Sequence, residues 1–236
     1  MTITKLMIAV SLAVWLNTAV ADADPHHKGQ QIFHAFWLEA QYGGGNEGGI
    51  AHLDLDGWIG GDTHKLWLKT ETKQQKGRLK ENELWAMYSR NVAEFWDVQA
   101  GFRHDTQPES TSYAVFGVHG LAPYFLKTDA HLFVSDYGDV TARLKQSTHL
   151  LFTQQFGIEP YYRLDLAAQR VDRQELGRGL TSGRLGLRFN YEISREITPY
   201  LDLRYDRKFG GTARIASSND QRRDSYTVSL GLRLMF

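Results

Sequence analysis

Histidines and acidic residues at two-residue spacing are the residues of this sequence most suited to chemistry. His52, Asp54 and Asp56 follow one another in AHLDLDGWIG (51–60), and His131 lies in LKTDAHLFVS (126–135), which has the same alternation. Imidazole is a good ligand for Cu(II) and Zn, and carboxylates can complete such a ligand set. These four residues are one candidate metal site. The alternative is an ordinary polar interior whose groups satisfy one another.

A second candidate metal site is the pair His26 and His27, close to the expected start of the mature chain. Asp24 or the terminal amine can join the two imidazoles as a further Cu(II) ligand. The alternative is that both histidines are ordinary residues of a tail.

The elements that must position these residues are β-strands. In SYTVSLGLRLMF (225–236), every second residue from Tyr226 to Phe236 is apolar, and the residues between them are mostly small or polar. A period of two predicts a strand with two unlike faces. The same pattern recurs along the whole chain. It fits either a soluble sandwich with charges outside or a membrane barrel with charges inside.

The connections between strands favour the barrel. Short turns lead into AEFWDVQAG (93–101), APYFLKTDA (122–130), EPYYRLDLA (159–167) and TPYLDLRYD (198–206). Their aromatic residues predict a girdle at one membrane interface, although a sandwich rim is the alternative. These residues are Phe95, Trp96, Tyr124, Phe125, Tyr161, Tyr162 and Tyr200. The alternate connections, at 42–49, 73–80, 105–111, 170–180 and 210–224, are polar and are predicted to be the longer loops.

The sequence therefore predicts an all-β fold, a transmembrane antiparallel up-and-down barrel of about twelve strands, with short periplasmic turns and longer extracellular loops. With an even number of strands, the first strand begins and the last strand finishes on the same side of the membrane. We expect the strand at 224–236 to close the sheet against the strand at 32–42. The predicted strands are 32–42, 50–60, 64–73, 81–91, 95–105, 112–120, 124–136, 139–154, 159–170, 181–192, 199–209 and 224–236.

The first residues predict a secretory signal peptide over residues 1–21. Lys5 precedes the apolar stretch Leu6–Leu16, and Ala19–Ala21 matches a cleavage site. The stretch is shorter than the about 20 residues that span a bilayer; a buried N-terminal helix is the alternative. The chain has no cysteine, so disulfides do not hold it together. Its 27 basic and 27 acidic residues balance, which argues against a nucleic-acid partner.

The polar faces of the strands carry charges of both signs. In a narrow barrel, opposite charges on neighbouring strands pair and fill the lumen. We expect such a plug to exclude large solutes, with small ions able to pass. The residues are Lys69, Glu71, Asp97, Arg103, Lys127, Asp129, Arg163, Asp165, Arg184, Arg188, Asp202, Arg204 and Asp206.

The sequence does not favour an enzyme. Twelve-stranded outer-membrane phospholipases need a Ser–His pair on the outer face. Ser112 and His119 would lie at opposite ends of one strand, about 20 Å apart at the usual rise per residue. No other serine and histidine are an evident pair in the sequence.

Several stretches resemble the copper resistance protein B family, whose members are outer-membrane proteins of Gram-negative bacteria. They are GWIGGDTHKLWLKTE (57–71), ELWAMYSR (83–90), WDVQAGFRHD (96–105), GVHGLAPYF (117–125) and YEISREITPYLDLRYDRKFGGTA (191–213). The resemblance implies copper tolerance and copper-ion binding at the outer membrane. Many members carry a long Met- and His-rich segment before the barrel, whereas here that segment is only DADPHHKGQQ (22–31). A cluster of thioether ligands for Cu(I) is therefore missing.

The expected organisation is a signal peptide at 1–21, a short His-containing periplasmic segment at 22–31 and a transmembrane β-barrel at 32–236. The expected function is copper resistance without enzymatic activity, by sequestering copper ions or controlling their passage. The expected partners are copper ions, outer-membrane lipid and periplasmic copper-resistance proteins. A small-solute channel without a metal role and a docking barrel for periplasmic copper proteins are the alternatives.

Overall fold

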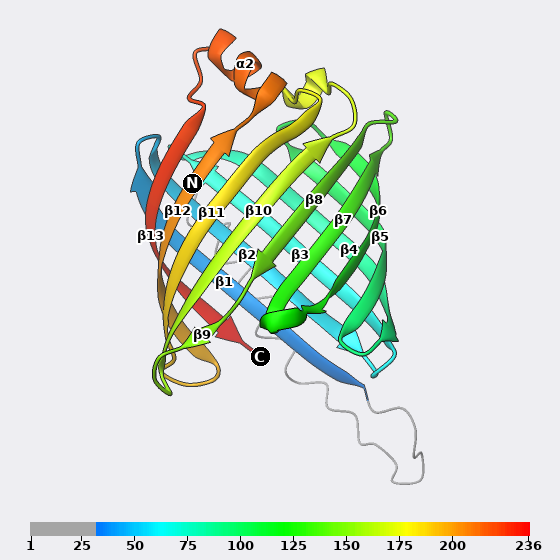
Figure 1. Cartoon of the computed structure of the whole chain (residues 1–236), viewed down its shortest axis with the longest axis vertical. Coiled ribbons are helices and arrows are strands. Elements are labelled where there is room, and N and C mark those ends of the chain that lie inside the picture. Colours follow the sequence, from blue (N-terminus) through cyan, green and yellow to red (C-terminus); the bar gives the residue numbers. More distant parts are fainter. Residues whose placement is uncertain (1–31) are drawn as a thin grey trace. The chain divides into compact units, whose positions relative to one another are not determined.

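The computed structural model describes residues 32–236, which form one closed antiparallel β-barrel (Figure 1). The short β9 continues the line of β8 along β10, so the wall has twelve strands, as predicted. Within residues 32–236 no helix is both long and apolar enough to cross a membrane. The strands are β1 (Phe33–Gly45), β2 (Gly48–Gly60), β3 (His64–Gln75), β4 (Arg78–Ala93), β5 (Trp96–Gln107), β6 (Thr111–Ala122), β7 (Leu126–Ser135), β8 (Val140–Ser147), β9 (Leu150–Leu151), β10 (Phe156–Ala167), β11 (Gly179–Tyr191), β12 (Ile197–Lys208) and β13 (Asp224–Met235).

The barrel closes between its first and last strands. β13 pairs with β1 over nine residue pairs, from Trp37–Met235 to Gly45–Thr227. Phe36 and Phe236 extend this pairing by exchanging backbone hydrogen bonds of 2.9 and 3.0 Å. The predicted closure is therefore confirmed. We call the end where β1 begins and β13 finishes the terminal end, and the opposite end the loop end.

The two faces of the strands differ as the alternation predicted. On β5, the side chain of Phe102 is 73% exposed on the outer face, whereas Gln99 and Arg103 are buried in the lumen. On β13, Leu230 is 69% exposed and its neighbour Ser229 is buried. In a soluble protein such a continuous apolar outer wall would be costly. Facing lipid, the same wall is favourable.

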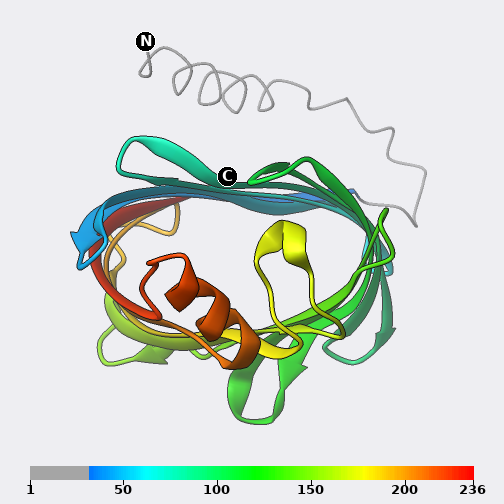
Figure 2. The same cartoon turned by 90° about the horizontal axis from the view of Figure 1, so that it is seen from above.

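The connections at the loop end differ from the prediction. Three of the five predicted longer loops are short, at 46–47, 76–77 and 108–110, because the neighbouring strands continue almost to the turn. Only the segments 168–178 and 209–223 are long. They contain η3 (Asp172–Gln174) and α2 (Gly210–Ser218), and Figure 2 shows both leaning over the mouth of the barrel.

The predicted aromatic girdle is only partly present. Phe95, Tyr124 and Phe125 project from turns at the terminal end and are 64, 95 and 79% exposed. Tyr161 and Tyr200 face the lumen instead. Tyr161 donates a hydrogen bond of 2.9 Å to Asp202, and Tyr200 is buried. The prediction was wrong for these two tyrosines. Each lies an even number of residues from lumen-facing charges on its own strand, so its side chain is on the same face as those charges.

A glycine opposite each of these two inward tyrosines leaves room for its ring. Tyr200 pairs with Gly231, and a Cβ at Gly231 would lie 2.3 Å from an atom of the ring. We expect Gly231→Ala to force the ring aside and to cost about 1–3 kcal/mol of unfolding free energy. Urea unfolding of the refolded barrel measures this loss. Gly49→Ala, where a Cβ meets nothing closer than 3.7 Å, is the matched control; an equal loss in both variants would contradict the packing argument.

Candidate functional site

The lumen contains two cavities. One of about 1000 Å³ opens at the loop end, and a smaller one of about 270 Å³ lies toward the terminal end. Five side chains line both cavities, and we call them the partition. They are Glu81, Arg143, Arg163, Arg184 and Arg204. A solute crossing the barrel has to pass these side chains.

A row of carboxylates crosses the wall formed by β1 to β5. Each of the five strands contributes one acidic residue, and each of these residues lies directly opposite the acidic residue of the following strand. They are Glu39, Asp54, Glu71, Glu83 and Asp105. Like charges placed directly opposite one another destabilise a sheet. The row therefore needs compensating cations, and we call it the carboxylate row.

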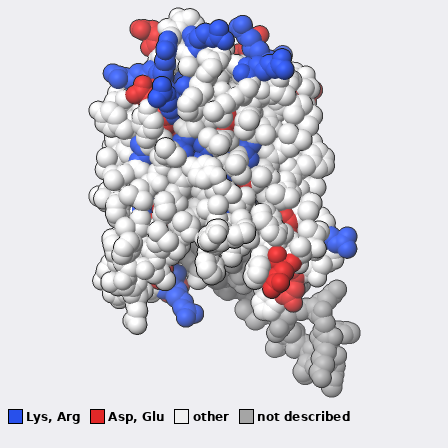
Figure 3. Space-filling view, in the orientation of Figure 1, with Lys and Arg blue, Asp and Glu red and all other residues white. Residues whose placement is uncertain are grey.

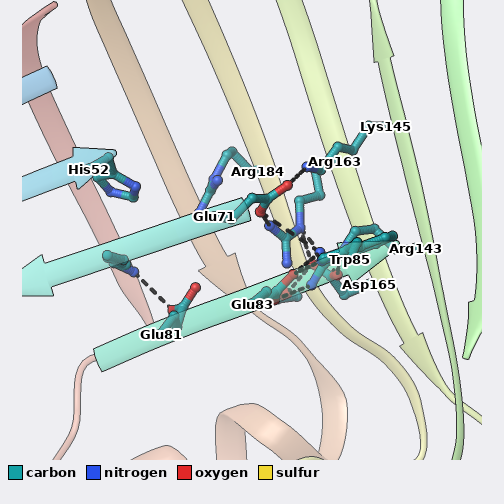
Figure 4. Close-up of polar contacts among 12 residues, drawn as sticks. His52, Glu71, Glu81, Glu83, Trp85, Arg143, Lys145, Arg163, Asp165 and Arg184 are labelled. Atoms are coloured by element: carbon teal, nitrogen blue, oxygen red, sulfur yellow. Dashed lines mark hydrogen bonds and ion pairs between the residues drawn. The ribbon is translucent and has the colours of Figure 1, made fainter. Parts of the chain in front are cut away.

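The compensating cations come both from across the lumen and from neighbouring strands, and Figure 4 shows the central part of this network. From β8, Arg143 donates to both carboxylate oxygens of Glu83 at 2.9 and 3.0 Å, and Lys145 forms an ion pair with Glu71. At the start of the row, Arg188 and Arg233 lie 3.2 and 2.7 Å from the two oxygens of Glu39. Arg–carboxylate pairs with two parallel bonds are the strong form of this interaction. The predicted pairing of opposite charges in the lumen is confirmed, but the side chains fill the lumen only in part, because the two cavities remain.

An aromatic cluster fills the lumen beside β3 to β7. Its buried members are Trp67, Trp85, Met87, Tyr113, Val115 and Phe133. The guanidinium of Arg103 lies 4.9 Å from the ring centroids of both Tyr113 and Phe133, within the range of a cation–π contact. This cluster was not predicted, because the aromatic residues are isolated in the sequence and meet only when their strands pair.

The four predicted metal-site residues of the barrel, His52, Asp54, Asp56 and His131, all line the smaller cavity. The side chains of three of them contact other groups. Arg204 donates to Nε2 of His52 at 3.1 Å, Lys69 lies 3.5 Å from Asp56, and His131 donates to Gln99 at 2.9 Å.

One buried oxygen of this set has no hydrogen-bond partner among residues 32–236. Oδ1 of Asp56 is buried and accepts none from the residues that the structure describes. Residues 32–236 contain no group of three or more His, Cys, Asp and Glu side chains arranged to hold a metal ion. His26 and His27 lie outside the described residues.

The structure also forms two histidine pairs that sequence reasoning missed. His119 lies 2.7 Å from Asp129 beside Lys69, and Nδ1 of His104 lies 3.0 Å from Oγ of Ser112 on the outer face. Both are direct cross-strand pairs. The strand register would have been needed to find them. Among residues 32–236, no side chain hydrogen-bonds to the second ring nitrogen of His104, so a catalytic triad is not formed there.

Solved structures with a similar barrel are outer-membrane porins. The NanC porin superposes with a TM-score of 0.57 at 12% identity, covering 84% of this chain and 98% of that one. The KdgM porin gives 0.56 at 11% identity, covering 85% and 99%. At this identity the likeness concerns the fold. Together with the apolar outer wall and the ion-paired lumen, it defines the class as a transmembrane β-barrel.

The family follows from the sequence comparisons. Residues 33–236 match the family model "Copper resistance protein B precursor (CopB)", so the chain belongs to the copper resistance protein B family. A copper resistance protein B homolog of Pseudomonas syringae pv. tomato is 34% identical over 231 residues, covering 92% of this chain and 78% of the relative. Copper resistance protein B of Escherichia coli is 33% identical over 183 residues, covering 77% of this chain and 62% of that relative. The resemblance noted from the sequence is confirmed.

Proposed function

We propose that this barrel supports copper resistance by binding copper ions in the smaller cavity and limiting their passage across the outer membrane. The family supports the copper role, and the barrel fold supports the outer membrane as its location. In this proposal residues 1–21 are removed as a signal peptide, the terminal end faces the periplasm and the loop end faces outside. Periplasmic copper-resistance proteins would then meet the terminal end. The proposal includes no enzymatic step.

The observation that carries the proposal is that His52, Asp54, Asp56 and His131 all line one cavity. Imidazole nitrogens and carboxylate oxygens are suitable donors for Cu(II). Because Lys69 and Arg204 already engage Asp56 and His52, copper would bind by exchange, with these cations moving away. Oδ1 of Asp56 accepts no hydrogen bond from the described residues, so copper can bind this oxygen without displacing a donor from it.

His26 and His27 are a second proposed copper site. They precede the barrel by a few residues in the sequence. An imidazole pair there would provide nitrogen ligands for copper, and binding at this pair would displace no cation of the lumen. The two sites are separable, because each can be substituted without touching the other.

Copper binding in the smaller cavity predicts quenching of tryptophan fluorescence. Trp37 and Trp85 both line this cavity, and a bound Cu(II) ion quenches nearby indoles. We expect saturable quenching of the refolded full chain by Cu(II), and binding at least about tenfold weaker in the Asp54→Asn/Asp56→Asn double variant. A fluorescence titration measures both affinities.

The control is Asp172→Asn, in the exposed η3 segment, which we expect to leave the affinity unchanged. Equal quenching in the double variant and the wild type would place copper elsewhere. Saturable binding that disappears only in the His26→Ala/His27→Ala variant would assign the copper site to the segment 22–31.

A channel for small solutes is the second candidate function. The observation that favours it is the pair of cavities on either side of the partition. Salt-dependent conductance in a planar bilayer that Cu(II) does not alter would favour this channel over copper binding. Conductance that falls as Cu(II) is added is the outcome expected from the copper proposal.

A further inference from the structure

The larger cavity, at the loop end, is basic. Thirteen Lys and Arg side chains and eight Asp and Glu side chains line it. In Figure 3, Lys and Arg gather at this end of the molecule, while most of the visible outer wall is uncharged. Clefts lined by one sign of charge concentrate counter-ions from solution. The excess of positive charge at this mouth is therefore suited to anions.

The floor of this cavity carries a guanidinium pair that shares one carboxylate. Nε of Arg184 lies 2.6 Å from Oδ1 of Asp206, and Nε of Arg204 lies 3.3 Å from Oδ2 of the same residue. The Arg204 side chain is only 4% exposed, and its Nε has no hydrogen-bond partner among the described residues. A buried donor without a partner is costly. One carboxylate thus serves two guanidinium groups, and an anion at this floor would offset the remaining positive charge.

The rim of the cavity carries further basic side chains. Arg78, Lys80 and Arg222 line the cavity, are exposed, and form no ion pair within residues 32–236. Rim and floor belong to the same space of about 1000 Å³. An anion with several charged groups can contact both.

We propose that the loop-end cavity is a binding site for a soluble multivalent oxyanion, such as a polyphosphate or a polycarboxylate. Guanidinium groups match the geometry of phosphate and carboxylate oxygens. The cavity residues face the lumen, so the ligand comes from solution and not from the headgroups of the surrounding leaflet. The same field disfavours entry of free divalent cations at the loop end, which leaves the terminal end as their approach to the smaller cavity.

The test uses the refolded full chain in detergent with inorganic pyrophosphate as the probe. Calorimetric titration is expected to show saturable binding that weakens as salt is added. The Arg78→Gln/Arg222→Gln variant is expected to bind at least about tenfold more weakly. The matched control is Arg90→Gln/Arg195→Gln, which removes two exposed basic residues from the terminal end and is expected to bind as the wild type does.

Absence of saturable binding would overturn the proposal, and so would an equal loss in both double variants. A phosphorylated glycolipid in the same detergent distinguishes the two sources of phosphate. We expect it not to displace pyrophosphate, and displacement would overturn the assignment to a soluble ligand. None of these outcomes depends on copper, so the proposed copper function is tested separately.

Discussion

Glu83→Ala is expected to be the most destabilising single substitution in the lumen. Glu83 is buried and pairs with Arg103 at 2.9 Å and with Arg143 through two bonds, while Trp85 donates its indole N–H to it at 3.1 Å. Its removal leaves two buried guanidinium groups without their shared carboxylate. Breaking a buried pair by removing one partner costs about 3–5 kcal/mol. Urea unfolding of the refolded barrel, followed by tryptophan fluorescence, measures the loss.

The control for this prediction is the exposed ion pair of Arg170 and Asp172, whose side chains are 67 and 75% exposed. Surface pairs contribute about 0–1 kcal/mol, so Asp172→Ala should leave unfolding nearly unchanged. A loss below about 1 kcal/mol in Glu83→Ala would mean that water reaches the lumen charges freely. The description of these lumen charges as a buried ion-paired network would then be wrong.

Leu230→Arg is expected to destabilise the barrel from its outer face. Leu230 lies near the middle of β13 and is 69% exposed. An arginine facing lipid near the bilayer midplane costs about 2–4 kcal/mol, and near the interfaces about 0–1 kcal/mol. Tyr226→Arg, on the same face of the same strand but near the loop end, should therefore cost less. Guanidinium unfolding in lipid vesicles measures both variants.

Equal effects at the two positions would contradict the assignment of this face to lipid. A water-exposed wall has no dependence on depth, and both arginines would then be tolerated. Circular dichroism of the refolded variants, compared with the wild type, shows whether each has reached the folded barrel before unfolding is measured.

The sequence was sufficient for the strands and their faces, because a period of two is a local property of each segment. The count of twelve, the closure of β13 on β1 and the inward placement of Asp202 and Arg204 were all predictable in this way. The terminal apolar positions such as Leu230 were assigned to the outer face for the same reason.

The arrangement inside the lumen needed the register between strands, which alternation does not supply. The carboxylate row exists only because five acidic residues on five strands fall directly opposite one another. The contacts of Arg143 with Glu83 and of Arg204 with His52 join residues 60 and 152 positions apart. No spacing rule connects such pairs.

The loop end was the least predictable region. A Gly-rich stretch at 42–49 and a charge-rich stretch at 73–80 suggested long loops, yet the paired strands extend to turns of two residues there. The helix α2 begins with two glycines, which are poor helix formers, and no polar side chain caps its N-terminus. Its placement comes from the packing of the segment 209–223 over the mouth, where Gly177 donates to Thr212 at 2.9 Å.

The most direct test of the central claim is copper tolerance in the cell. The gene is deleted, and growth on graded Cu(II) is compared after restoring the wild type, Asp54→Asn/Asp56→Asn or His26→Ala/His27→Ala, with outer-membrane levels of each barrel confirmed. The account predicts lost tolerance that the wild type restores and the lumen variant restores poorly. Unchanged tolerance after deletion, in a strain without a second copper-resistance system, would contradict it.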